Sequence, residues 1–106
     1  MERYYKLIRI LRKECPPAFP VSVRRLALKD DGFCQKKSDK FIIGIDKTLT
    51  EREAIDTLLH EWSHARAWNH LHDAMDEGEF EKKIHDAAWG VAYSEVYRIY
   101  EEKLLS

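Results

Sequence analysis

The chain has 106 residues, of which 44% are hydrophobic and 35% charged, and its formal net charge at pH 7 is -1. This length and composition predict a single domain spanning residues 1–106. The near-neutral charge argues against a broad nucleic-acid-binding surface. No apolar run approaches the ~20 residues of a membrane helix, and the N-terminus lacks a signal-peptide layout, so we expect a cytoplasmic protein without membrane contact.

The first predicted element is a helix over residues 2–14. Its apolar residues recur at helical spacing and share one side: Tyr4, Leu7, Ile8 and Leu11. Arginine and lysine residues occupy the other side, which is typical of a solvated helix face. Pro16 and Pro17 then end the helix.

Three short segments with β-type patterning follow. Residues 20–28 contain a β-like run, and residues 33–35 are a second candidate. Residues 40–46 (KFIIGID) are the strongest candidate, because they are rich in β-branched and aromatic side chains. Turn-forming residues separate the three segments. The pattern predicts a small antiparallel sheet.

Two helices are predicted in the second half of the chain. Thr50 and Glu53 fit a capping box, so a helix should run from about Glu51 to about Asn69. One side of this helix carries apolar residues, namely Ile55, Leu58, Trp62 and Ala65. Residues 70–79 resemble a polar loop, and residues 80–105 return to helical spacing. We therefore expect an α+β domain, with Trp62, Trp68 and Trp89 in its core.

The most specific motif is His60-Glu61-Trp62-Ser63-His64, which has the pattern H-E-x-x-H within the predicted helix. Positions i and i+4 lie on one helix face, so both imidazoles can bind one metal ion. Glu61 lies about 100° around the helix, within reach of a water molecule at that metal. Two imidazoles and a carboxylate predict a zinc hydrolase site in which Glu61 is the general base.

A catalytic zinc ion needs a third protein ligand and one open position. The candidates are His70, His72, Asp73, Asp76, Glu77, Glu79, Glu81 and His85. His70 and His72 follow His64 too closely to fold back easily if the helix continues to residue 69. His85 lies 21 residues after His64, where a second helix should begin. Spacing singles out His85 and leaves the other candidates open.

Residues 58–68 (LLHEWSHARAW) and 85–98 (HDAAWGVAYSEVYR) resemble SprT-like zinc metallopeptidases, and most closely their small, phage-type members. The resemblance covers about the second half of the chain. It implies a minimal zincin fold with His85 as the third ligand, since the ligand of that family precedes an aromatic pair similar to Trp89-Gly90. Gly90 would then permit close approach of the last helix to the motif helix.

The resemblance also implies a function. The chain would hydrolyse protein or peptide substrates with Zn²⁺ as its cofactor, as a virus-encoded protein in the host cytoplasm. His60, His64 and His85 would hold the metal, and Glu61 would take a proton from the attacking water. Tyr93 is the candidate donor to the oxyanion, with Tyr97 and Arg98 as alternatives.

Larger SprT-like members act on proteins crosslinked to DNA through an added zinc ribbon or DNA-binding tail. This chain has no C-x-x-C pair and no basic tail, so we expect no tight DNA binding, and free thiols at Cys15 and Cys34.

Two other functions remain open. One is a zincin-fold binding or regulatory module with a zinc site and little turnover, which would not need Glu61. The other is a nucleic-acid adaptor that uses the basic face of the first helix.

Overall fold

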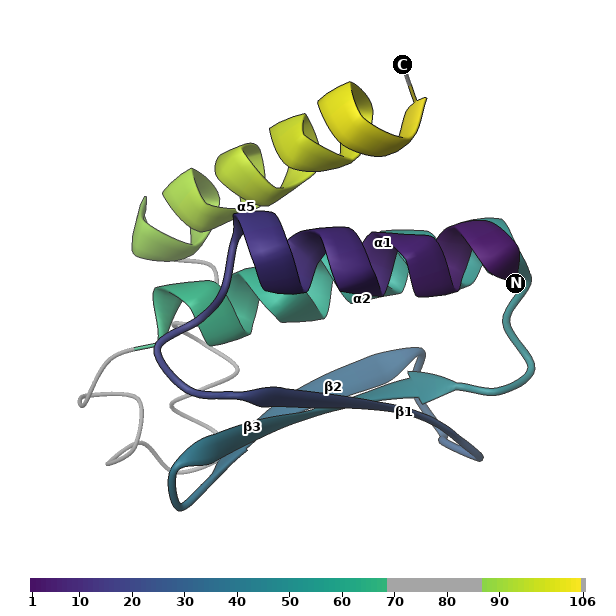
Figure 1. The fold of residues 1–106 in the computed structure, drawn as a ribbon. Helices are drawn as coiled ribbons and strands as arrows, with labels where there is room; N and C mark the ends of the chain where they lie inside the picture. The colour runs from purple at the N-terminus through teal and green to yellow at the C-terminus, as the bar shows by residue number, and fades with distance from the viewer. Residues whose placement is uncertain (69–86, 106) are drawn as a thin grey trace.

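The computed structural model describes residues 1–68 and 87–105, which form three layers (Figure 1). A three-stranded sheet is the first layer, α1 and α2 lie on it as the second, and α5 crosses these helices on the side away from the sheet. The elements are α1 (Glu2–Glu14), β1 (Val21–Leu26), β2 (Gly32–Lys37), β3 (Lys40–Asp46), α2 (Glu51–Ala67) and α5 (Ala87–Tyr100), which continues as a short π-helix, η1 (Glu101–Leu105). The α+β class is therefore confirmed.

The sheet is mixed, so the prediction of an antiparallel sheet is wrong in part. Its strand order is β1-β3-β2, in which β2 pairs antiparallel with β3 and β1 pairs parallel with it. Residues 38–39 form a tight turn between β2 and β3, whereas residues 27–31 carry the chain past the end of β3. The most apolar strand takes the central position, and its buried residues include Phe41, Ile43 and Ile45.

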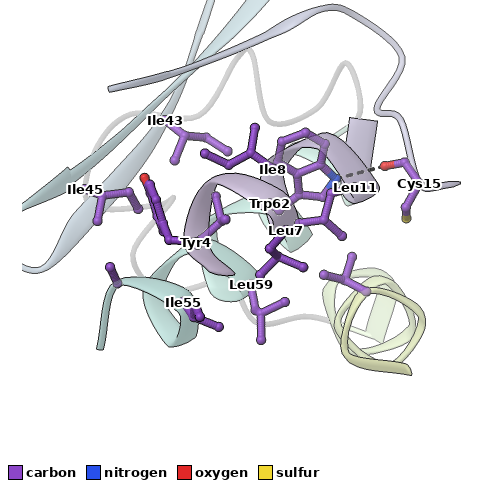
Figure 2. Packing of buried hydrophobic residues seen from close by; sticks show 13 residues of the cluster. Tyr4, Leu7, Ile8, Leu11, Cys15, Ile43, Ile45, Ile55, Leu59 and Trp62 are labelled. Carbon is purple, nitrogen blue, oxygen red and sulfur yellow. Dashed lines mark hydrogen bonds between the residues drawn. The ribbon is translucent and has the colours of Figure 1, made fainter. Parts of the chain in front are cut away.

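The core lies between the sheet and the two helices above it (Figure 2). All four residues predicted on the apolar side of α1 are buried there. They meet Ile43 and Ile45 from β3, and Ile55, Leu59 and Trp62 from α2. Each large apolar side chain that is fully buried contributes about 1.5–3 kcal/mol. This burial anchors one face of α2 and leaves the other face for the site.

The capping box at the start of α2 is confirmed. The Glu53 amide donates to the Thr50 hydroxyl at 3.2 Å, and the Thr50 amide donates to the Glu53 carboxylate at 2.9 Å. These bonds satisfy two backbone donors that a helix start otherwise leaves unpaired. They set the first residue of α2 and thus the face on which each later side chain lies.

A polar cluster joins the C-terminal end of α1 to α2 and α5. The Arg66 guanidinium donates to the Pro16 carbonyl oxygen at 2.7 Å and to the Glu95 carboxylate at 3.2 Å. The Cys15 thiol donates to the same Glu95 oxygen at 3.1 Å. Because Arg66 and Glu95 are about one-third exposed, solvent weakens their ion pair. The cluster still defines where α5 crosses α2.

Two further observations concern the helices. No helix within residues 1–68 and 87–105 is both long and apolar enough to cross a membrane. Gly90 does not pack against α2, contrary to expectation, because a Cβ built on it meets no described residue within 4 Å. The helix turns Gly90 outward, about 100° away from the neighbouring Trp89, which faces the site. The predicted loop at residues 70–79 lies outside the described residues.

Candidate metal centre

The two histidines of the motif meet on one face of α2. Its 17 residues contain neither glycine nor proline, so the helix continues without a break through the motif. His60 and His64 are one turn apart, their ring centroids are 4.8 Å apart, and their Nε2 atoms are 3.2 Å apart. The predicted convergence of both imidazoles is confirmed.

This spacing suits a zinc ion. Two nitrogens held about 2.0–2.1 Å from a tetrahedral ion lie about 3.3 Å from each other. The observed 3.2 Å between the Nε2 atoms is within about 0.1 Å of that value. One ligand atom from each of His60, Glu61 and His64 lies within 4.8 Å of the other two. Imidazole nitrogens in this arrangement suit a transition-metal ion, of which zinc is one, and a carboxylate lies beside them.

Glu61 is a buried carboxylate beside the His pair. Only 8% of the residue is exposed, and its carboxylate makes no hydrogen bond or ion pair within the described parts of the chain. Burial raises the pKa of this carboxyl to about 7, because desolvation disfavours its charged form. The Cys34 thiol of β2 lies close enough that its pKa, raised mainly by burial, is raised further by the charge of Glu61. Glu61 therefore faces the edge strand of the sheet.

Helix α5 covers the His pair with aromatic rings. The Trp89 ring centroid is 5.2 Å from that of His60 and 5.6 Å from that of His64. Tyr93 stacks on the far side of Trp89, with centroids 4.9 Å apart and planes at 20°. His64 is consequently only 5% exposed. Trp89, which we expected in the core, instead forms a wall of the site.

Tyr93, the proposed oxyanion donor, stacks on Trp89, and Trp89 in turn contacts both histidines. Burial raises the pKa of its hydroxyl, and the charges of Tyr97 and Asp56 raise it further. Tyr97 continues the row of aromatic rings, 5.8 Å from Tyr93. The Tyr93 hydroxyl is therefore protonated at neutral pH and able to donate a hydrogen bond. Its catalytic role stays a prediction, as do those of Tyr97 and Arg98.

The third ligand falls on a part of the chain that the structure does not describe. His85 lies outside the described residues, as do His70, His72 and the acidic candidates between residues 73 and 81. The described end of α5 starts two residues after His85, and Trp89 on its first turn contacts both histidines. His85 as the third ligand stays a prediction.

A cavity of about 300 Å³ opens beside Glu61. Its wall is formed by the start of β2 and the exposed side of α2, with lining residues Asp31, Gly32, Asp56, Thr57, His60 and Glu61. Asp56 and Thr57 precede His60 by four and three positions, so helical spacing puts them on the histidine face of α2. Asp31 was not predicted, because its position depends on how the loop before β2 passes α2.

Comparisons with protein-family models, with curated proteins and with solved structures each returned no match. The resemblance to SprT-like metallopeptidases stays a hypothesis, which the two quoted sequence segments carry. The geometry of His60, Glu61 and His64 is an independent observation about the same motif.

Proposed function

We propose that this chain is a zinc-dependent metallopeptidase with a minimal zincin-like fold, similar to the SprT-like enzymes. The single observation that carries the proposal is the pair of Nε2 atoms 3.2 Å apart, with the Glu61 carboxylate buried beside them on the same helix. A structural zinc site needs ligands alone. A carboxylate next to the metal ligands adds the general base that an H-E-x-x-H hydrolytic site uses.

Each residue has a defined task in this reaction. His60 and His64 would hold the zinc ion, and the family resemblance adds His85 as the third ligand. When bound, zinc lowers the pKa of water and polarises the carbonyl oxygen of the peptide bond that is cut. Glu61 accepts the proton from the attacking water and then delivers it to the leaving amine nitrogen. Burial makes Glu61 a stronger base, because desolvation destabilises its carboxylate relative to the protonated, neutral form.

The aromatic wall from α5 supports this chemistry. Trp89 packs against both imidazoles, so it limits their motion and keeps bulk water from one side of the site. Tyr93 stands behind Trp89 with a protonated hydroxyl, which can stabilise the oxygen that becomes negative during attack. Substrate approach is then expected from the side of Glu61 and the cavity at β2.

Glu61→Gln is the decisive variant. It keeps the shape of the side chain and removes the base, so zinc content should stay at one ion per chain while cleavage of a labelled, unfolded protein falls at least ~10²-fold. Glu14→Gln makes the same chemical change at an exposed position on α1 and serves as the matched control. His60→Ala should abolish stoichiometric zinc.

Three other results would count against the proposal. Unchanged turnover in Glu61→Gln would exclude this residue as the base. Loss of zinc in the same variant would make Glu61 a ligand. Stoichiometric zinc without cleavage of any unfolded protein by the wild type would instead favour the binding or regulatory module.

A further inference from the structure

The cavity beside Glu61 is formed by two segments that are far apart in the sequence. Asp31 ends the loop before β2 and Gly32 begins β2, whereas Asp56 and Thr57 come from the second turn of α2. His60 and Glu61 form the inner wall of the same cavity. A group bound there would lie directly beside the proposed catalytic base.

The described lining of the cavity is negatively charged. Asp31 and Asp56 both belong to it, and no lysine or arginine within residues 1–68 and 87–105 does. Within residues 1–68 and 87–105, neither carboxylate forms a hydrogen bond or an ion pair. Their negative charge is therefore not offset by a cation from those parts of the chain, and it attracts a cation from outside.

A second observation concerns Glu61, whose partner in the proposed reaction is the attacking water. Glu61 is more than nine-tenths buried, lines this cavity, and has no hydrogen-bond partner in the described parts of the chain. Leaving a buried polar group without a partner is costly. A polar group that enters the cavity, or water that accompanies it, would satisfy this carboxylate.

The shape of the cavity suits a long, flexible side chain. Its volume of about 300 Å³ is at the lower end for ligand pockets. Gly32 keeps the strand close to α2, because a Cβ at this position would stand 2.6 Å from the Thr57 methyl carbon. An aliphatic stem can pack on that methyl group while its charged end reaches the carboxylates.

We infer that this cavity is a substrate subsite that binds the side chain of a lysine or arginine next to the peptide bond that is cut. Asp31 and Asp56 would select the positive charge, and Thr57 and Gly32 would contact the stem. The inference rests on the proposed peptidase function, which it makes more specific. It predicts cleavage beside basic residues.

The test uses quenched fluorescent peptides that differ at one position, which holds lysine, arginine, norleucine or glutamate. Norleucine matches most of the lysine stem and lacks its charge. For the wild-type protein, kcat/KM should be at least about tenfold higher with lysine than with norleucine, the gain expected from a charge-assisted hydrogen bond. This preference should shrink as salt is raised.

Two variants test the residues. Asp31→Asn/Asp56→Asn should bring the lysine-to-norleucine ratio close to 1, and Asp56→Lys should shift the preference toward glutamate. Asp39→Asn, in the exposed β2–β3 turn, should keep the wild-type ratio. A second measurement does not need turnover: Glu61→Gln should bind the lysine peptide more tightly than the norleucine peptide in fluorescence anisotropy.

The possible failures are distinguishable. If the wild-type protein cleaves none of the peptides and no unfolded protein, the proposed function fails and this inference fails with it. If it cleaves the lysine and norleucine peptides equally well, or if Asp31→Asn/Asp56→Asn keeps the preference, the subsite is wrong and the peptidase function stands. A second metal ion that disappears in Asp31→Asn/Asp56→Asn would make the cavity a cation site and overturn the subsite as well.

Discussion

Replacing Trp62 with phenylalanine tests how the core supports the helix that carries the candidate metal site. Trp62 is fully buried on the side of α2 that faces away from the His pair. Its indole nitrogen donates to the Cys15 carbonyl oxygen at 2.8 Å (Figure 2). Cys15 is also fully buried, so in the variant this carbonyl oxygen loses the indole donor without gaining contact with solvent.

The expected loss of stability has two parts. Leaving a buried acceptor without its donor costs about 1–3 kcal/mol. The phenyl ring also lacks two of the indole carbons, and at about 0.8 kcal/mol per buried carbon their loss costs about 1.5 kcal/mol. Together these effects should lower the free energy of unfolding by roughly 2.5–4.5 kcal/mol. That is a large fraction of the about 5–15 kcal/mol that holds a typical domain together.

Urea unfolding at a fixed zinc concentration measures this loss. Tyr4→Phe is a matched control in the same core, because the buried Tyr4 hydroxyl has no hydrogen-bond partner among the described residues. Its removal should change stability by less than about 1 kcal/mol. Zinc stoichiometry should be unchanged in both variants, since neither touches His60 or His64. A loss below about 1 kcal/mol in Trp62→Phe would refute the reasoning.

Three further predictions address the last helix, the thiols and the basic face of α1. Gly90→Ala should raise the unfolding free energy by about 0.5–1 kcal/mol, because the position is helical and open; a lower melting temperature would indicate a close contact at Gly90. Burial, and then Glu95, raise the pKa of the Cys15 thiol to about 12, so it is protonated well above neutral pH. Iodoacetamide should therefore label Cys15 slowly at pH 8 until urea unfolds the protein, and rapid labelling of the folded protein would contradict this. Duplex DNA should bind with a dissociation constant no lower than ~1 µM at physiological salt, as measured by fluorescence anisotropy. A submicromolar dissociation constant that rises when the basic face of α1 is neutralised would instead favour the nucleic-acid adaptor. That face consists of Arg3, Lys6, Arg9 and Arg12.

Local patterns in the sequence determined the helices and the relative orientation of His60 and His64. Periodicity predicted the buried side of α1, because a helix repeats every 3.6 residues whatever it packs against, and Pro16-Pro17 predicted its end. Thr50 and Glu53 marked the start of α2, since a capping box involves only residues three apart. Given that helix, the spacing of His60 and His64 placed both imidazoles on one face.

The order of the strands was decided by tertiary structure. Segments that follow one another in the sequence suggested a simple antiparallel arrangement. In the folded chain the most apolar strand, β3, instead lies between its neighbours, because a central strand is hydrogen-bonded on both edges and buries more surface. This order places β2 at the edge, beside α2 and the site.

The surroundings of the site were also decided by contacts between distant residues. Trp89 covers the histidines, Asp31 joins Asp56 at the cavity, and Glu95 meets the Cys15 thiol across a separation of 80 residues. A pattern of spacing within one helix carries no information about which surface of another element will cover it. The H-E-x-x-H motif and the spacing of its side chains can therefore be recognised in the sequence. The burial of Glu61 and the charge of the neighbouring cavity arise only when the chain folds.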